Sequence, residues 1–261
     1  MAYFRYFIHL AYDGTNFHGW QRQSNSVTIQ QVMESVMTLV MHFPITLTGA
    51  GRTDSGVHAT SYFAHFDIQV KLGEEERKDL VFKLNRFLNH QIVVFSIFPV
   101  PEKAHARFSA VSRTYKYYIT TRKNPFRYPF SFYLFGKIDM QLMNTGADLL
   151  TEYSDFTSFS KVDHDTRTNI CKILYARWET VDDGLTFTIT ANRFLRNMVR
   201  AIVGTLLEVG KEKITMEEVR QIVESKNRCN AGESVPAKGL FLHSIQYPET
   251  VYSLEPIFFP G

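Results

Sequence analysis

A glycine-rich stretch near the start of the chain constrains this protein more than any other feature. It reads Gly-Ala-Gly-Arg-Thr-Asp-Ser-Gly-Val-His-Ala and occupies residues 49–59. Glycine is favoured where the backbone takes a positive φ or passes close to another group. An alternating run follows at 61–68, with the period of a β-strand. The sequence therefore predicts a tight loop that carries Asp54 and leads into a strand.

The spacing of Arg52 and Asp54 indicates possible chemistry for this loop. Asp54 lies two residues after Arg52, and a nearby guanidinium favours the ionised form of a carboxyl group. An ionised aspartate is a poor general acid and a good nucleophile or base. The alternative is a glycine-rich turn in which the two side chains form a purely structural pair, and spacing alone does not decide between them.

Composition sets broad limits on the class of protein. The chain has 261 residues, enough for one large domain or two modest ones, and its 44% hydrophobic and 21% charged content is ordinary for a soluble globular protein. A net charge of +3 neither demonstrates nor excludes a nucleic-acid partner, because a local basic groove matters more than the total. The two cysteines, Cys171 and Cys229, exclude a disulfide-rich scaffold. With no membrane-spanning stretch and no signal-peptide layout, we expect a cytoplasmic protein.

Strand and helix patterns alternate along both halves of the chain. The expected strands are 4–12, 61–68, 92–98, 111–119, 170–178, 185–191 and 240–247, and the expected helices begin at Thr28, Glu74, Asp139, Phe194 and Thr215. This order predicts an α+β fold with two α/β lobes, 1–104 and 105–247, that share a mostly antiparallel sheet, followed by a tail at 248–261. A cleft between two such lobes is a natural binding site.

The helix expected at 194–208 carries a candidate phosphate-binding stripe. Arg193, Arg196 and Arg200 follow one another at i, i+3 and i+7, which places them along one edge of a helix. No acidic residue lies between Phe194 and Leu207 to pair with them. Arginines of this kind suit phosphate binding. A solvated charged edge is the alternative.

Four ordered segments resemble the TruA-type tRNA pseudouridine synthases. The glycine-rich loop has every fixed residue of that family's G-R-T-D-x-G-V-H-A pattern. Similar matches are F-S-A-x-x-R-x-Y-x-Y at 108–117, F-L-x-x-M-V-R at 194–200 and P-A-x-G-L at 236–240, with a further match at 12–21. The resemblance implies two pseudo-symmetric lobes with a basic cleft, assembled as a homodimer. It also implies isomerisation of uridine to pseudouridine in the anticodon stem-loop of tRNA, at tRNA positions 38 to 40, with no cofactor.

The resemblance also implies roles for individual residues. Asp54 becomes the catalytic aspartate, and Arg200, with Arg52, holds it ionised. Tyr115 stacks on the target base, and Leu240 packs beneath it. The other expected substrate-binding residues are Arg193, Arg196 and His58. A structural role for His58, bonded to the loop backbone, is the alternative, and no histidine pair has metal-site spacing, so no metal is expected.

Two other classes of protein stay open at this point. One is an RNA-binding module with the family fold and no catalysis, and the other is a small-molecule hydrolase that uses Asp54 and His58. An aromatic segment at 125–133 also lacks an assigned role. It interleaves aromatic side chains with Arg127, a pattern that suits either RNA stacking or a dimer contact.

Overall fold

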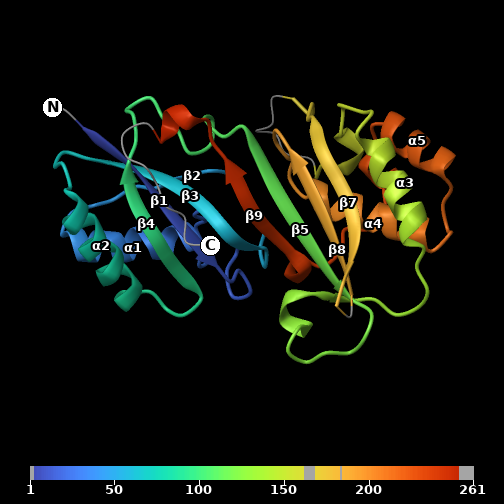
Figure 1. Ribbon diagram of the computed structural model, residues 1–261, viewed down its shortest axis with the longest axis horizontal. Helices are drawn as coiled ribbons and strands as arrows, with labels where there is room; N and C mark the ends of the chain where they lie inside the picture. The colour runs from blue at the N-terminus through green and yellow to red at the C-terminus, as the bar shows by residue number, and fades with distance from the viewer. Residues whose placement is uncertain (1–2, 162–167, 183, 253–261) are drawn as a thin grey trace. The chain divides into compact units, whose positions relative to one another are not determined.

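A computed structural model describes residues 3–161, 168–182 and 184–252. The chain forms two compact units, and Figure 1 labels most of their helices and strands. The first unit runs from the N-terminal end to Val111 and resumes at Leu242, and the second runs from Ser112 to Phe241. The lobe boundaries expected at residues 104 and 247 stay a prediction.

The first unit is built on strands in the order β4-β1-β3-β9. Its strands are β1 (Phe4–Tyr12), β2 (Thr48–Gly49), β3 (His58–Ile68) and β4 (Ile92–Pro99), together with β9 (Leu240–Gln246) from Leu242 onward. The alternating pattern predicts strand β1, and this strand pairs antiparallel with both β3 and β4. Helices α1 (Ile29–Met41) and α2 (Glu74–Phe87) complete the unit.

Helix α1 shows how the local sequence fixes an element and where the apolar pattern misleads. Thr28 caps the helix, and its side chain accepts a hydrogen bond from the Gln31 backbone N–H, as its position in the sequence predicts. Met33 and Met37 are buried, whereas Leu39 is 57% exposed. Successive helical residues are about 100° apart, so Leu39 lies on the side opposite Met37. Leu39 therefore faces solvent, although it is apolar and lies among the apolar residues of the helix.

The second unit has strands in the order β5-β8-β7, with β6 paired parallel to β5. Its elements are β5 (Ser112–Thr120), β6 (Phe132–Tyr133), α3 (Met140–Leu150), β7 (Ile173–Val181), β8 (Gly184–Ala191), α4 (Met198–Gly210) and α5 (Met216–Glu224). The α3 side chain Asn144 ties that helix to β7, because its Oδ1 accepts from Trp178 N at 2.8 Å and its Nδ2 donates to Trp178 O at 3.1 Å. Helix α5 begins after Thr215, as expected, and Thr215 and Glu218 form its capping box.

The predicted α+β class with mostly antiparallel pairing is confirmed. Strands β7 and β8 pair antiparallel as far as Val181 and Gly184, whose connection, an Asp-Gly pair of the kind that favours a hairpin turn, includes Asp183, which lies outside the described residues. Within the part of the chain that the structure describes, no helix combines the length and apolar character that crossing a bilayer requires.

Candidate active site

The glycine-rich segment forms a tight loop between β2 and β3. Its turn closes with a hydrogen bond from Val57 N to Asp54 O at 3.1 Å, and Gly56 takes a positive φ of 75°. On the other side of Asp54, the Tyr62 hydroxyl donates to Gly51 O at 2.5 Å. The backbone is therefore held both before and after Asp54, as a loop that positions a reacting side chain requires.

Thr53 anchors the loop to the core of the first unit. Its Oγ1 lies 2.9 Å from the Tyr12 hydroxyl, and the two residues are only 8% and 4% exposed. The neighbours of Thr53 in the chain are less buried, since Asp54 is half-buried and Arg52 is exposed. Thr53, at the centre of the Arg-Thr-Asp step, is thus buried in the core, while the Asp54 carboxylate and the Arg52 guanidinium on either side stay accessible.

A second loop, residues 13–20, supports the Asp54 loop through backbone contacts. A Cβ atom at Gly19 would lie 2.2 Å from Thr53 O, and Gly19 itself has a φ of +80°. The Phe17 carbonyl accepts from Gly56 N at 3.2 Å and from Ser55 Oγ at 3.3 Å. Glycine is needed at residue 19 because no side chain fits between the two backbones. Neither the spacing nor the periodicity of the sequence indicates this contact.

His58 joins the same two loops. It is 1% exposed, and its Nδ1 accepts a hydrogen bond from Gly14 N at 3.1 Å and lies 3.1 Å from Asp13 Oδ1. Burial acts to raise the pKa of Asp13, but hydrogen bonds from Thr15 and Gln91 and the nearby His58 together lower it. These contacts make His58 a brace for loop 13–20, and its expected role toward a substrate stays a prediction.

Tyr115 and Tyr117 point to the same face of β5 but differ in environment. Tyr115 is half-buried and meets Phe194 edge-to-face, with ring centroids 5.1 Å apart. Tyr117 is buried and its hydroxyl donates to Pro236 O at 2.9 Å. Burial raises the pKa of Tyr117, against an opposing effect of the Arg200 charge. Tyr115 is therefore the tyrosine with an accessible ring, while Tyr117 fixes the segment that precedes Leu240.

Arg200 and Leu240 are linked within the second unit through the segment before β9. Arg200 Nε donates to Val235 O at 2.7 Å, and Val235 N donates back to Arg200 O at 3.3 Å. Leu240 is 5% exposed, and a Cβ at the preceding Gly239 would lie 2.8 Å from the Tyr117 ring. The structure thus brings Tyr117, Arg200 and the Pro-Ala-Lys-Gly-Leu segment together.

The expected basic stripe along one helix is wrong. Helix α4 begins at Met198, and its N-cap Asn197 has a left-handed φ of 65°, so Arg193 and Arg196 lie in the preceding loop. The Arg196 carbonyl accepts from Lys161 N at 3.1 Å, and Asn197 Nδ2 donates to Ser234 Oγ at 2.6 Å. These long-range contacts hold the loop in a non-helical path, which asparagine tolerates. Of the three arginines, only Arg200 is helical.

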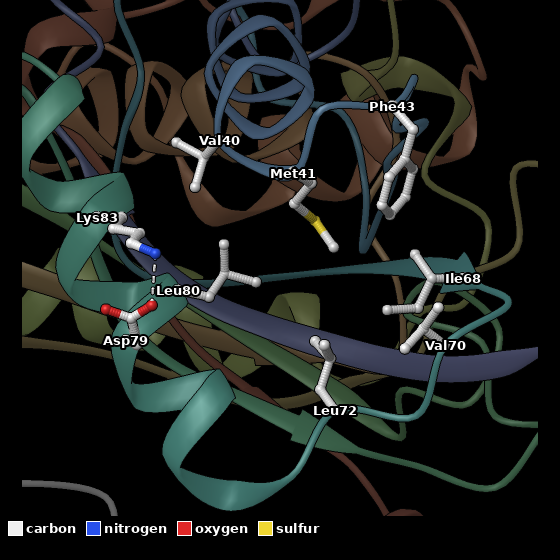
Figure 2. A pocket seen from close by; sticks show the side chains of 9 residues that line it. All are labelled: Val40, Met41, Phe43, Ile68, Val70, Leu72, Asp79, Leu80 and Lys83. Carbon is white, nitrogen blue, oxygen red and sulfur yellow. Dashed lines mark ion pairs between the residues drawn. The ribbon is translucent and has the colours of Figure 1, made fainter.

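A pocket in the first unit lies away from the Asp54 loop (Figure 2). It is lined by Val40, Met41, Phe43, Ile68, Val70, Leu72, Asp79, Leu80 and Lys83. Asp79 and Lys83, the charged residues in this described lining, form an ion pair with 2.7 Å between Oδ2 and Nζ. None of the predicted site residues is among its described lining residues, so it is separate from the Asp54 loop.

Comparison with known proteins gives one consistent result. The sequence profile of a family described as "tRNA pseudouridine synthase" matches residues 8–109 and 153–248. A protein of Parabacteroides distasonis named tRNA pseudouridine synthase A is 51% identical over 96% of this chain and 99% of its own length. Proteins of the same name from Bacteroides thetaiotaomicron and Clostridium acetobutylicum are 49% and 40% identical, over 96% and 91% of this chain and 93% and 97% of their own lengths.

The matched residues include the Asp54 loop in an α+β fold, which places the chain among the pseudouridine synthases, a class of isomerases. Within that class, the chain belongs to the tRNA pseudouridine synthase family. The resemblance stated from its motifs is confirmed.

Proposed function

We propose that this protein isomerises uridine to pseudouridine at positions 38 to 40 in the anticodon stem-loop of tRNAs, and that it does so in the cytoplasm as a homodimer. The observation that carries the proposal is the Arg52-Thr53-Asp54 step, in which a buried Thr53 presents a half-buried carboxylate on a doubly anchored backbone. The names of the relatives, tRNA pseudouridine synthase A, support the same reaction class.

The reaction is an isomerisation: one bond to the ribose carbon is exchanged for another, and the product has the same atoms as the substrate. The bond between the ribose carbon and uracil nitrogen breaks, the base turns, and a bond from the same ribose carbon to a ring carbon forms, while the proton displaced from that carbon is balanced by one gained at nitrogen. In this proposal Asp54 is the essential carboxylate, and Arg52 and Arg200 keep it ionised and oriented. An enzyme acting on a base must take it out of the stack.

The remaining candidates are proposed to bind the extruded nucleotide and its backbone. Tyr115 offers a half-buried ring for stacking on uracil, and Leu240 supplies apolar surface beneath it. Arg193 and Arg196 are proposed to contact phosphates, for which side chains on a loop are as suitable as side chains on a helix. Because phosphate contacts release counterions, we expect tRNA affinity to fall steeply with salt.

Asp54→Ala and Asp54→Asn test the proposal directly. We expect both variants to lose detectable tritium release from tRNA labelled at the uracil ring carbon, with tRNA affinity within a few-fold of wild type, since the carboxylate is not a major source of affinity. Asp148→Ala, which alters an exposed aspartate on α3, is the matched control and should keep full activity.

Three outcomes would contradict the proposal. Substantial turnover by Asp54→Ala would remove the aspartate from the chemistry. A wild-type protein that binds tRNA without making pseudouridine, detected by carbodiimide labelling of the product, would support the RNA-binding module. Faster turnover of a small substrate than of tRNA would support a hydrolase.

A further inference from the structure

The connection between β5 and α3 displays aromatic rings to solvent. This segment, residues 121–137, is called the aromatic loop below; it contains six aromatic residues, four lysines or arginines and no acidic residue. Phe126 and Phe135 are 89% and 85% exposed, the highest values among the large apolar side chains of the described residues. Tyr128 is 63% exposed. Exposed aromatic groups of this density mark an interaction surface rather than a core.

The aromatic loop is a folded structure that holds these rings in place. Asn124 Oδ1 accepts from Phe126 N at 3.0 Å, and Asn124 O accepts from Tyr128 N at 2.9 Å. Ser131 Oγ donates to the Arg127 carbonyl at 2.7 Å, and the short strand β6 within the loop pairs with the end of β5. In Figure 1 the aromatic loop is the green connection that follows β5. A pre-organised loop loses little conformational entropy on binding.

The aromatic loop is attached to the Leu240 segment of the candidate site, within the second unit. Lys238 Nζ donates to Tyr128 O at 2.9 Å and lies 3.4 Å from the centroid of the Tyr128 ring. The ring of Phe130 is 6.3 Å from that of Phe241, the residue after Leu240. Tyr128 and Phe130 therefore attach the aromatic loop to the segment that is proposed to pack beneath the target base.

The charge of the aromatic loop selects an anionic partner. Arg122, Lys123 and Lys137 are exposed, whereas Arg127 forms an ion pair with Asp182. A ligand that combines negative charge with flat apolar faces matches both features, and single-stranded nucleic acid has a phosphate for every base. An apolar protein surface would match the rings and leave the cations without compensation.

We propose that the aromatic loop is a stacking platform for unpaired bases of the tRNA substrate, with Phe126 and Phe135 as the stacking rings and Arg122, Lys123 and Lys137 on the flanking phosphates. The proposal rests on the proposed function and extends it to a second contact surface on the RNA. Base–aromatic stacking is tolerant of sequence, so the platform supports binding of several different tRNAs.

The first test compares two pairs of exposed phenylalanines. Phe126→Ala/Phe135→Ala should weaken the binding of an unmodified tRNA transcript by at least about fivefold for each ring removed and raise KM with little change in kcat. The control pair Phe82→Ala/Phe87→Ala removes rings of α2 that are 61% and 60% exposed and should bind normally. The unfolding temperature of both pairs should match the wild type, because all four rings are at the surface.

A second test reports stacking directly. Phe126→Trp places an indole in the loop, while the native Trp20 and Trp178 are 2% and 1% exposed and contribute a buried background. We expect tRNA to quench the new fluorescence, and Phe87→Trp to show no such quenching. Arg122→Gln/Lys123→Gln should reduce the slope of log affinity against log salt by about 1–2.

The results separate this proposal from the one on which it rests. A wild-type protein that fails to make pseudouridine in tRNA overturns both. Normal pseudouridine formation, with unchanged tRNA affinity in Phe126→Ala/Phe135→Ala and no quenching in Phe126→Trp, overturns only the stacking platform. A shift of the double variant to a smaller species in sedimentation, at unchanged RNA affinity, would overturn it too and assign the loop to contact between protein copies.

Discussion

The hydrogen bond between Tyr12 and Thr53 gives a quantitative test of how the Asp54 loop is positioned. Both residues are buried, and the two oxygens are 2.9 Å apart. Tyr12→Phe or Thr53→Val removes one hydroxyl and leaves the other buried without this contact, which costs about 1–3 kcal/mol. The double variant removes both hydroxyls, so its cost should be close to that of either single variant. The double-mutant cycle in urea unfolding should then give a coupling energy of the same size as one single substitution, about 1–3 kcal/mol.

The same variants should separate positioning from folding. If Thr53 sets the place of the Asp54 carboxylate, the double variant should lose between about tenfold and a hundredfold in kcat, with KM for tRNA little changed, because small misplacements of a reacting group cost rate rather than affinity. Tyr175→Phe, at a β7 residue 44% exposed, is the control and should be silent in both assays. Strictly additive unfolding energies, or a normal kcat in the folded double variant, would refute this reasoning.

Two further predictions concern loop 13–20, which supports the Asp54 loop, and the buried histidines in the sheet of the first unit. Gly19→Ala should destabilise the protein by more than about 1 kcal/mol and reduce turnover, because a Cβ would lie 2.2 Å from Thr53 O at a φ of +80°. The control is Gly51→Ala, whose added Cβ has no atom within 4 Å and which should unfold at the wild-type urea concentration. Equal losses of stability in the two variants would contradict the close contact as the cause. Burial lowers the pKa of both His9 and His65 to about 4, so the unfolded chain binds protons below pH 6.5 that the folded one does not, and stability should fall from pH 6.5 to 4 by roughly 1–3 kcal/mol per histidine. Between pH 7.5 and pH 5, thermal melting should show a smaller loss of stability in His65→Gln than in wild type. The exposed-site control His18→Gln should lose as much stability as wild type. The same loss in both variants would contradict the role of His65 in the pH dependence.

Local patterns predicted most elements because their causes are local. The alternation in β1 and the cap at Thr28 depend on residues within one strand or one helical turn, and both are confirmed. The start of α4 was not predictable in this way. Phe194 and Leu195 continue the apolar period of the helix, and only distant contacts, from Lys161 and Ser234, show that the chain is non-helical there.

In the candidate site, too, the residues that local sequence identifies differ from those that only tertiary contacts reveal. Asp54 and Arg52 stand out because glycines surround them within one short segment. The side chains that hold the loop do not, since Tyr12 bonds Thr53 across 41 residues and the Phe17 carbonyl meets Ser55 across 38. No spacing rule links residues so far apart, and their roles follow only from tertiary packing.

The first unit is built from two segments that are far apart in the chain, and this has a consequence for its synthesis on the ribosome. Its β3 strand is flanked by β1 and by β9, and Thr60 on β3 donates to the His243 carbonyl at 3.3 Å. Ribosomes make the N-terminal part first, so β3 leaves the exit tunnel with β1 and the short β2 as partners. The part of its edge around Thr60, which β9 later occupies, stays open, and an open edge is prone to pairing with other chains. That edge is not covered until translation has passed residue 246. The nascent protein must therefore keep a half-finished sheet from aggregating while nearly all of the remaining chain is added.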